Sequence, residues 1–308
     1  MNHPQLEDEL RRMAARLEAA ERGLAERTLQ LEIVLDVLRG RDRAIAEQAE
    51  WDFATELQTA ALPQNFPPFP ERRDFDIHAG MVTAKEVGGD LYDFFLIEPN
   101  RLAFVVADAA GKGLPAAIFI TLARTLLRAA AARLQRPGDC LQMVNAMLCT
   151  DNHSLMFVTA FYGTLDLLTG TVEYANAGHN PPYVLRADRN AADRVVERVP
   201  STGDIVLGVM EESRYETRRL NLAAGDALVC FSDGVTEAVS PAAELFGERR
   251  LEALLVDQVG AHPTDILGTV ISGVDQFMSL APMADDVTLL VLRYNAGLSP
   301  EKEHQPDV

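Results

Sequence analysis

Cysteine is rare in this chain of 308 residues, which has three, Cys140, Cys149 and Cys230. Three cysteines at irregular spacing are too few for a disulfide framework or a zinc site. Cys230 lies in an apolar, strand-like stretch, where a cysteine behaves as a small core residue. We therefore expect a fold without disulfides, in the reducing environment of the cytoplasm.

Basic residues are also few. The chain has 28 lysines and arginines against 46 aspartates and glutamates, a net charge of −18 and a pI near 4.7. Nucleic acids and anionic membranes both select a basic face, so we expect neither as a partner. We identify no signal peptide, and we expect no membrane-spanning segment. Because 48% of the residues are hydrophobic, the chain can bury a substantial core. Its length allows one large domain with an extension, or two small domains.

Glycine and proline are scarce in residues 1–50, where Gly23 is the only glycine before Gly40 and no proline follows Pro4. Apolar residues recur there at spacings of four and three, at Leu6, Leu10, Met13, Leu17, Ala20, Leu24, Leu31, Val34, Leu38 and Ile45. This heptad pattern predicts a long helix whose narrow apolar stripe needs a partner. We expect a parallel coiled coil that makes the protein a homodimer. The alternative is a long helix that folds back onto its own domain.

The segment 51–73 separates this extension from the rest of the chain. Residues 51–62 continue as a helix with a different apolar phase, and the proline-rich run that follows ends any helix. Mixed strand and helix patterns fill residues 74–295, which we expect to form the folded domain. The polar residues 296–308 are expected to form a disordered tail.

Short apolar runs predict strands in this domain, and longer runs with helical periodicity predict helices. The expected strands are Phe75 to Thr83, Leu91 to Ile97, Leu102 to Ala107, Phe157 to Leu168, Thr171 to Ala177, Tyr183 to Arg186, Ile205 to Val209, Tyr215 to Leu220, Ala227 to Ser232 and Val287 to Tyr294. The expected helices are Leu114 to Leu134, Cys140 to Cys149, Gly247 to Val259 and Pro263 to Leu280. Because the strands come in adjacent groups, the pattern favours an α+β domain with antiparallel sheets and segregated helices over a doubly wound fold.

One stretch joins a buried strand to a helix through a turn that carries a carboxylate. The apolar run 102–107 ends at Asp108, and a Gly-Lys-Gly turn leads into a helix with Pro115 in its first turn. The strand end holds the carboxylate on rigid backbone, and the glycines permit a tight turn and close approach of another group. A hard metal ion needs a ligand held this firmly. An aspartate that only caps the helix is the alternative.

Further aspartates stand at the ends of other strand-like segments. Asp90 follows a Gly-Gly pair, Asp233 follows an apolar strand, and Asp285 and Asp286 open the last strand. Carboxylates grouped at one edge of a sheet repel one another unless cations hold them, and oxygen-only ligands suit Mg²⁺ or Mn²⁺. Two such ions about 3.5–4 Å apart assist an in-line displacement at phosphorus. The spacing in the sequence leaves open whether these aspartates converge in space.

Five motifs occur in order along residues 75–294. They are Glu-Val-Gly-Gly-Asp, Val-Ala-Asp-Ala-Ala-Gly-Lys-Gly, Ala-Gly-His-Asn-Pro-Pro, Ser-Asp-Gly-Val-Thr-Glu-Ala and Asp-Asp-Val-Thr. This set resembles the SpoIIE-type branch of the PPM (protein phosphatase 2C-like) serine/threonine phosphatases, and within it the RsbU-like regulators of bacterial stress responses. The resemblance implies an antiparallel β-sandwich flanked by helices, with a pair of Mn²⁺ or Mg²⁺ ions at one edge and a metal-dependent phosphatase activity.

The resemblance also assigns roles to residues of this chain. Asp108 would bridge both ions, with the Ala109 carbonyl assisting at one of them. Asp233 and Asp285 would hold the second ion. Asp90 would act on the first ion through water, which makes Asp108 and Asp90 the expected catalytic residues.

Partners follow from the same resemblance. The implied substrate is a small phosphoprotein of the anti-anti-sigma (STAS) type in a partner-switching pathway. The segment from Leu57 to Pro63 resembles the switch helix that precedes this domain in its relatives. We hypothesise that an upstream regulator bound to the N-terminal helix acts through this segment.

The chain departs from the eukaryotic PPM pattern, which has a histidine just after the bridging Asp-Gly. Here Ala109 and Ala110 follow Asp108, so the general acid is water or a residue that the sequence does not identify. Lys85 and Lys112 are weak candidates for a phosphate-binding cation.

Several other residues carry a plainer interpretation. Asp286 stands where Asn is often found and ranks below Asp285 as a ligand. His78 and His179 are expected to be structural, and Tyr92 and Asp93 to stabilise the strand after Asp90.

The alternative function is a pseudophosphatase that only binds partners. The complete set of four aspartates favours activity.

Overall fold

The computed structural model describes residues 48–187 and 195–296 of a chain that divides into two compact units, Met1–Phe53 and Ala54–Val308. Of the first unit only residues 48–53 are described, and they are helical. Nearly all of the predicted coiled coil, residues 1–47, therefore lies outside the described residues, as does the predicted tail from residue 297.

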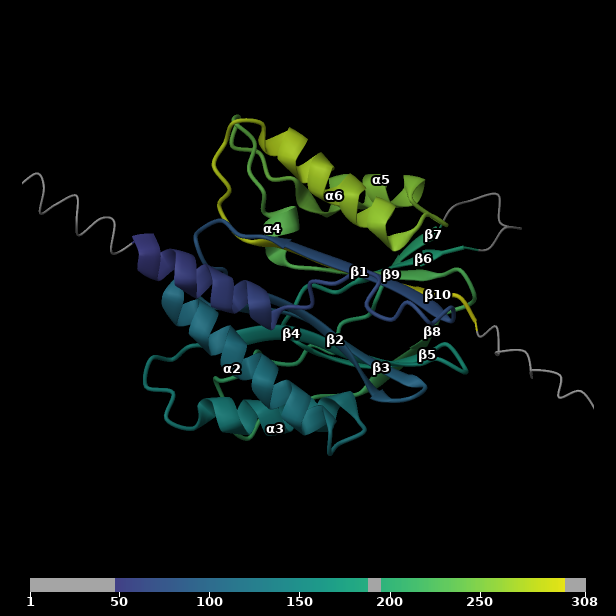
Figure 1. Cartoon of the computed structure of the whole chain (residues 1–308), viewed down its shortest axis with the longest axis horizontal. Helices are drawn as coiled ribbons and strands as arrows, with labels where there is room; N and C mark the ends of the chain where they lie inside the picture. The colour runs from purple at the N-terminus through teal and green to yellow at the C-terminus, as the bar shows by residue number, and fades with distance from the viewer. Residues whose placement is uncertain (1–47, 188–194, 297–308) are drawn as a thin grey trace, which may run out of the picture. The chain divides into compact units, whose positions relative to one another are not determined.

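The second unit contains two antiparallel sheets of five strands each (Figure 1). In the first sheet the order is β1 (Phe75–Val82), β10 (Val287–Tyr294), β9 (Ala227–Phe231), β6 (Tyr183–Arg186) and β7 (Val195–Arg198). In the second sheet the order is β2 (Asp90–Glu98), β3 (Arg101–Ala109), β4 (Val158–Asp166), β5 (Thr171–Ala177) and β8 (Arg218–Asn221). Every described pairing within the two sheets is antiparallel.

Helices cover the outer face of each sheet (Figure 1). Helices α2 (Leu114–Ala131) and α3 (Pro137–Cys149) pack on the second sheet, and α5 (Gly247–Asp257) and α6 (Pro263–Met278) pack on the first. A single turn, α4 (Asp233–Thr236), follows β9. The predicted antiparallel sandwich with flanking helices is confirmed.

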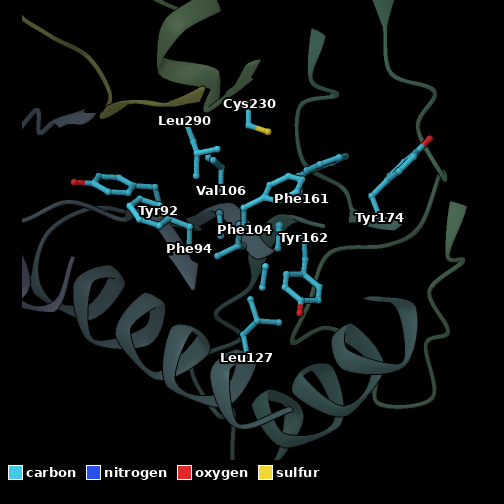
Figure 2. Close-up of a cluster of buried hydrophobic side chains, with 14 of the residues drawn as sticks. Tyr92, Phe94, Phe104, Val106, Leu127, Phe161, Tyr162, Tyr174, Cys230 and Leu290 are labelled. Atoms are coloured by element: carbon cyan, nitrogen blue, oxygen red, sulfur yellow. The ribbon is translucent and has the colours of Figure 1, made fainter. Parts of the chain in front are cut away.

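The main hydrophobic cluster lies between the two sheets and extends to α2 and α3 (Figure 2). Leu290 and Cys230 from the first sheet meet Phe161 and Val106 from the second, and Cys230 is fully buried, as predicted. A second cluster fills the space between the first sheet and helices α5 and α6. Because each sheet is covered on both faces, the central strands β3 and β10 are apolar along most of their length rather than alternating.

Three elements differ from the predictions. The strand predicted at residues 205–209 is wrong, because Asp204 bridges to β5 and Leu207 bridges to β4, and Gly208 then turns the chain with φ +92°. Strand β7 was not predicted because its two valines stand among charged residues. The single turn α4 is too short for a periodic pattern.

Helix α2 is, among the described residues, the one helix that is long and apolar enough by length and composition to cross a membrane. This helix packs against β2 and β3 and beside α3. A helix that packs against a sheet can have the same composition, so the hydropathy of α2 is weak evidence for a membrane span.

Candidate active site

Strand ends bring the four predicted carboxylate ligands to one edge of the sandwich. Asp90 begins β2 and faces Asp108 of β3 as its register partner. Asp233 follows β9, and Asp285 lies just before β10, which is the neighbour of β9. Each sheet therefore contributes two aspartates, and the convergence that the sequence spacing left open is present.

The charge of this cluster shifts the acidity of Asp108. Burial is the largest cause, and the nearby charges of Asp233, Asp285 and Asp286 add to it, so that the pKa of Asp108 rises to about 7. The positive charge of Lys112 opposes this rise. Asp108 thus lies among acids whose mutual repulsion a cation relieves.

The pKa values of Asp90 and Asp233 are also raised. Burial raises the pKa of Asp90 well above its ordinary value, and the charge of Asp108 raises it further. Burial also raises the pKa of Asp233, with contributions from Glu237 and Asp285. Asp90 is 3% exposed, and its Oδ2 atom has no hydrogen-bond partner. A buried carboxylate oxygen without a donor is suited to a cation.

Asp286 has a different role from the four predicted ligands. Its side chain is 7% exposed, Oδ1 accepts the Ala84 N–H at 2.7 Å, and Oδ2 accepts the Gly89 N–H at 2.7 Å. A Cβ atom at Gly88 would lie 2.7 Å from the same Oδ2, so any larger residue there would displace the Asp286 carboxylate. Asp286 thereby fixes the loop that leads into Asp90.

The backbone around Ala109 joins this loop to the end of β3. The Ala109 N–H donates to the Gly89 carbonyl at 3.0 Å, and the Ala110 N–H donates to the Phe157 carbonyl at 2.8 Å. A Cβ atom at Gly89 would lie 3.0 Å from the Ala109 carbonyl oxygen and 3.4 Å from Asp108 Oδ1. The Ala109 carbonyl therefore lies close to the aspartates, which is compatible with the role that the family resemblance gave it.

A short helical segment, residues 54–61, contacts the same loop from outside. Gln58 donates from Nε2 to the Gly88 carbonyl at 2.6 Å and accepts the Gly88 N–H at Oε1 at 2.9 Å. Thr55 Oγ1 donates to the Glu86 carbonyl at 2.6 Å, and the Tyr92 hydroxyl donates to the Pro63 carbonyl at 3.0 Å. The segment that resembles a switch helix is thus bonded directly to the loop before Asp90.

The donor set fits Mg²⁺ or Mn²⁺, because it consists of carboxylate and carbonyl oxygens and includes the unpartnered Asp90 Oδ2. In the described part of the chain, no three His, Cys, Asp or Glu side chains lie together in a way that could hold one ion. Mg²⁺ commonly keeps several waters and takes only one or two carboxylates. Ions at this edge would therefore keep part of their hydration shell.

Other residues considered from the sequence lie in structural positions. His179 is buried, with Nδ1 2.8 Å from Thr159 Oγ1, and burial lowers its pKa to about 4. His78 lies against the ring of Phe66, and Lys85 is exposed. Asp93 is buried and pairs with Arg124 at 2.9 Å and with Arg128 at 2.6 Å, so it ties β2 to α2.

Sequence reasoning missed the contacts of Asp286, Gln58 and Lys112. The sequence signalled Asp286 only as the second member of an Asp pair, and no pattern linked Gln58 to Gly88. Lys112 was considered only as a weak candidate for a phosphate-binding cation, but it forms an ion pair with Asp285. All three contacts join residues that are distant in the sequence, and so they depend on the finished fold.

The family model described as Stage II sporulation protein E (SpoIIE) matches residues 98–295, more than half of the chain. The chain belongs to the SpoIIE family. Like the family, it carries a PP2C-type phosphatase domain, and its sheets and helices agree with that fold. The SiaA-PP2C domain of Pseudomonas aeruginosa superimposes with a TM-score of 0.71 at 20% identity, over 81% of this chain and 97% of that one.

Two curated proteins show the same similarity in sequence. Protein IcfG of Synechocystis sp. is 31% identical over 264 residues, which cover 76% of this chain and 40% of IcfG. The phosphoserine phosphatase RsbU of Bacillus subtilis is 26% identical over 272 residues, which cover 85% of this chain and 78% of RsbU. This SpoIIE-family chain thus spans less than half the length of IcfG and most of the length of RsbU.

Proposed function

We propose that the chain is a metal-dependent protein serine/threonine phosphatase that dephosphorylates a regulatory phosphoprotein. The observation that carries the proposal is the convergence of Asp90, Asp108, Asp233 and Asp285 at one edge, where burial and then the repulsion of neighbouring carboxylates raise the pKa of Asp108 to about 7. Membership of the SpoIIE family and the similarity to a phosphoserine phosphatase support the same chemistry.

Two divalent cations, Mn²⁺ or Mg²⁺, would be held by these residues. Asp108 and the Ala109 carbonyl would serve the first ion, on which Asp90 would act through water. Asp108, Asp233 and Asp285 would serve the second, partly through waters that the ion keeps. When bound, such a pair of ions supplies an activated water and neutralises charge on the phosphate.

The rest of the site keeps these ligands in place. The Asp286 carboxylate holds the Gly89 N–H, which fixes the start of β2 and therefore Asp90. The register pairing of Asp90 with Asp108 sets the distance between these two carboxylates. Rigid strand ends hold such groups with the precision that catalysis needs.

The substrate we propose is a serine-phosphorylated protein of the STAS-type anti-anti-sigma class, in a partner-switching pathway. The support is the similarity to RsbU, a phosphoserine phosphatase. The test is incubation of the Mn²⁺-loaded chain with a phosphorylated STAS domain, followed by intact-mass measurement. Loss of one phosphate is the expected result. A pseudophosphatase would bind the phosphorylated domain and leave its mass unchanged.

We also propose that the N-terminal helix makes the protein a dimer and receives an upstream regulator. The heptad pattern of residues 1–50 supports the dimer. The two hydrogen bonds between Gln58 and Gly88 offer a route from the helical segment to Asp90. The molar mass from light scattering, measured for the full chain and for residues 51–308, tests this proposal. If both are monomers, the proposed dimer is wrong.

A further inference from the structure

Lys112 forms an ion pair with one of the proposed metal ligands. Its Nζ atom lies 2.8 Å from Asp285 Oδ2 and also donates to the Ala284 carbonyl. Among residues 48–187 and 195–296, this is the only ion pair that involves Asp90, Asp108, Asp233 or Asp285. An ammonium group therefore already provides one positive charge to the carboxylate cluster.

The ion pair is placed where it can be exchanged. The Lys112 and Asp285 side chains are 40% and 38% exposed, and a pair this accessible to water changes an equilibrium only about two- to fivefold. Gly111 and Gly113 flank the lysine with φ of +94° and +79°, and a Cβ atom on either would meet nothing within 4 Å. The turn thus has open space around it, and a lysine on four flexible methylenes can leave Asp285 without disturbing packed structure.

The choice of lysine at this position is informative. The chain has three lysines, at positions 85, 112 and 302, and 25 arginines. Arginine would grip a carboxylate through two parallel hydrogen bonds, whereas the lysine ammonium is a compact, strongly hydrated point charge. A residue that must release Asp285 is better served by lysine.

We propose that Lys112 exchanges anionic partners: it pairs with Asp285 when no divalent cation is bound, and with the phosphate of the substrate when one is. A phosphate monoester brings negative charge to an edge that is already rich in carboxylates. Lys112 is the basic residue whose charge acts on both Asp108 and Asp233. The second half of the exchange rests on the proposed phosphatase function, and the first half does not.

The first test is calorimetric titration with Mn²⁺ alone, at fixed ionic strength and without substrate. Lys112→Met is expected to bind Mn²⁺ about three- to fivefold more tightly than wild type, because the competing ammonium is gone. Lys85→Met is the matched control, since it removes the same charge from an exposed residue of the loop before Asp90, and it should stay within about twofold of wild type. Unchanged or weaker Mn²⁺ binding by Lys112→Met overturns the proposal.

A double-mutant cycle separates displacement from general repulsion. Lys112→Met is repeated in an Asp285→Asn background, where the ion pair no longer exists. The gain in Mn²⁺ affinity should largely disappear there. An equal gain in both backgrounds would mean that Lys112 acts only through its distant charge, which contradicts a partner exchange.

The second test measures binding of inorganic phosphate to the Mg²⁺-saturated chain. Lys112→Met is expected to bind phosphate about fivefold or more weakly than wild type, and Lys85→Met as tightly as wild type. Equal phosphate affinity of wild type and Lys112→Met overturns the exchange. Neither titration requires turnover, so these outcomes are distinct from a failure of the proposed function, which would appear as absence of phosphate release from a phosphoserine protein.

Discussion

The Asp286 carboxylate accepts the Gly89 N–H at 2.7 Å, across 197 positions of the chain. This hydrogen bond connects the start of β10 to the start of β2. The other oxygen of the Asp286 carboxylate accepts the Ala84 N–H at 2.7 Å. Asp285 and Asp90 lie next to the two ends of this connection. The positions of the proposed ligands Asp90 and Asp285, which come from different sheets, therefore depend on Asp286. Both oxygens of the Asp286 carboxylate accept backbone N–H groups.

Replacing Asp286 by alanine should leave two N–H groups without their acceptors. We expect Asp286→Ala to lower the free energy of unfolding by about 2–4 kcal/mol and to weaken Mn²⁺ binding. Asp286→Asn keeps one acceptor oxygen and should lose about half as much. Urea unfolding measures the stability. Asp275→Ala, at an exposed position of α6, serves as control and is expected to stay within about 0.5 kcal/mol of wild type. Equal stability of Asp286→Ala and the control would contradict the assignment.

Gly234 is a steric requirement of the same region. A Cβ atom there would lie 1.9 Å from the Asp286 carbonyl oxygen, a backbone atom that cannot rotate away. We expect Gly234→Ala to destabilise the protein by about 3 kcal/mol or more. Gly268 in α6 has nothing within 4 Å of a Cβ atom, so Gly268→Ala should stabilise it by about 0.5–1 kcal/mol. The melting temperatures of the two variants should shift in opposite directions from that of wild type. Shifts in the same direction would refute the steric argument.

Gln58 tests the connection between the helical segment and the loop before Asp90. Gln58→Ala removes both hydrogen bonds to Gly88, and we expect about tenfold weaker Mn²⁺ binding and a loss of about 1–2 kcal/mol in the free energy of unfolding. Gln64→Ala is the control, because Gln64 bonds only locally, to the Thr59 carbonyl at 3.0 Å. Calorimetric Mn²⁺ titration of both variants decides the matter, and equal affinities would exclude a role for Gln58 in placing Asp90.

His179 predicts a specific dependence of stability on pH. Burial lowers its pKa from 6.5 to about 4, so the unfolded chain binds more protons than the folded chain between these values. The contribution of His179 is complete above pH 6.5 and is lost as the pH falls toward 4, by about 3 kcal/mol. Urea unfolding of wild type and His179→Asn at several pH values isolates it, because the acidic groups common to both cancel in the difference. A difference that does not change with pH would contradict this prediction.

Much of this fold could be predicted from sequence because apolar runs and turn residues are local signals. The strands around Asp90, Asp108 and Asp285 lie within two residues of their predicted bounds. The strand predicted at residues 205–209 is wrong because this part of the chain makes only isolated bridges, from Leu207 to β4 and from the preceding Asp204 to β5, which no local pattern contains.

The candidate site likewise has one part that local sequence signals predict and another that depends on the folded chain. The sequence showed which aspartates end strands, and the two sheets bring them together. The Asp286 bond to Gly89 and the Lys112 pair with Asp285 depend on register between elements far apart in the chain, which spacing alone does not determine. The predicted coiled coil in residues 1–50 remains a prediction.

The central claim is that the aspartate edge is a metal-dependent phosphatase centre. The most direct measurement is phosphate release from an aryl phosphate with Mn²⁺ and then with excess chelator, for wild type beside Asp108→Asn, with circular dichroism to verify folding. We predict turnover by wild type that the chelator abolishes, and a fall of at least about a hundredfold in folded Asp108→Asn. Turnover that persists in the chelator, or in Asp108→Asn at the wild-type rate, would contradict the account.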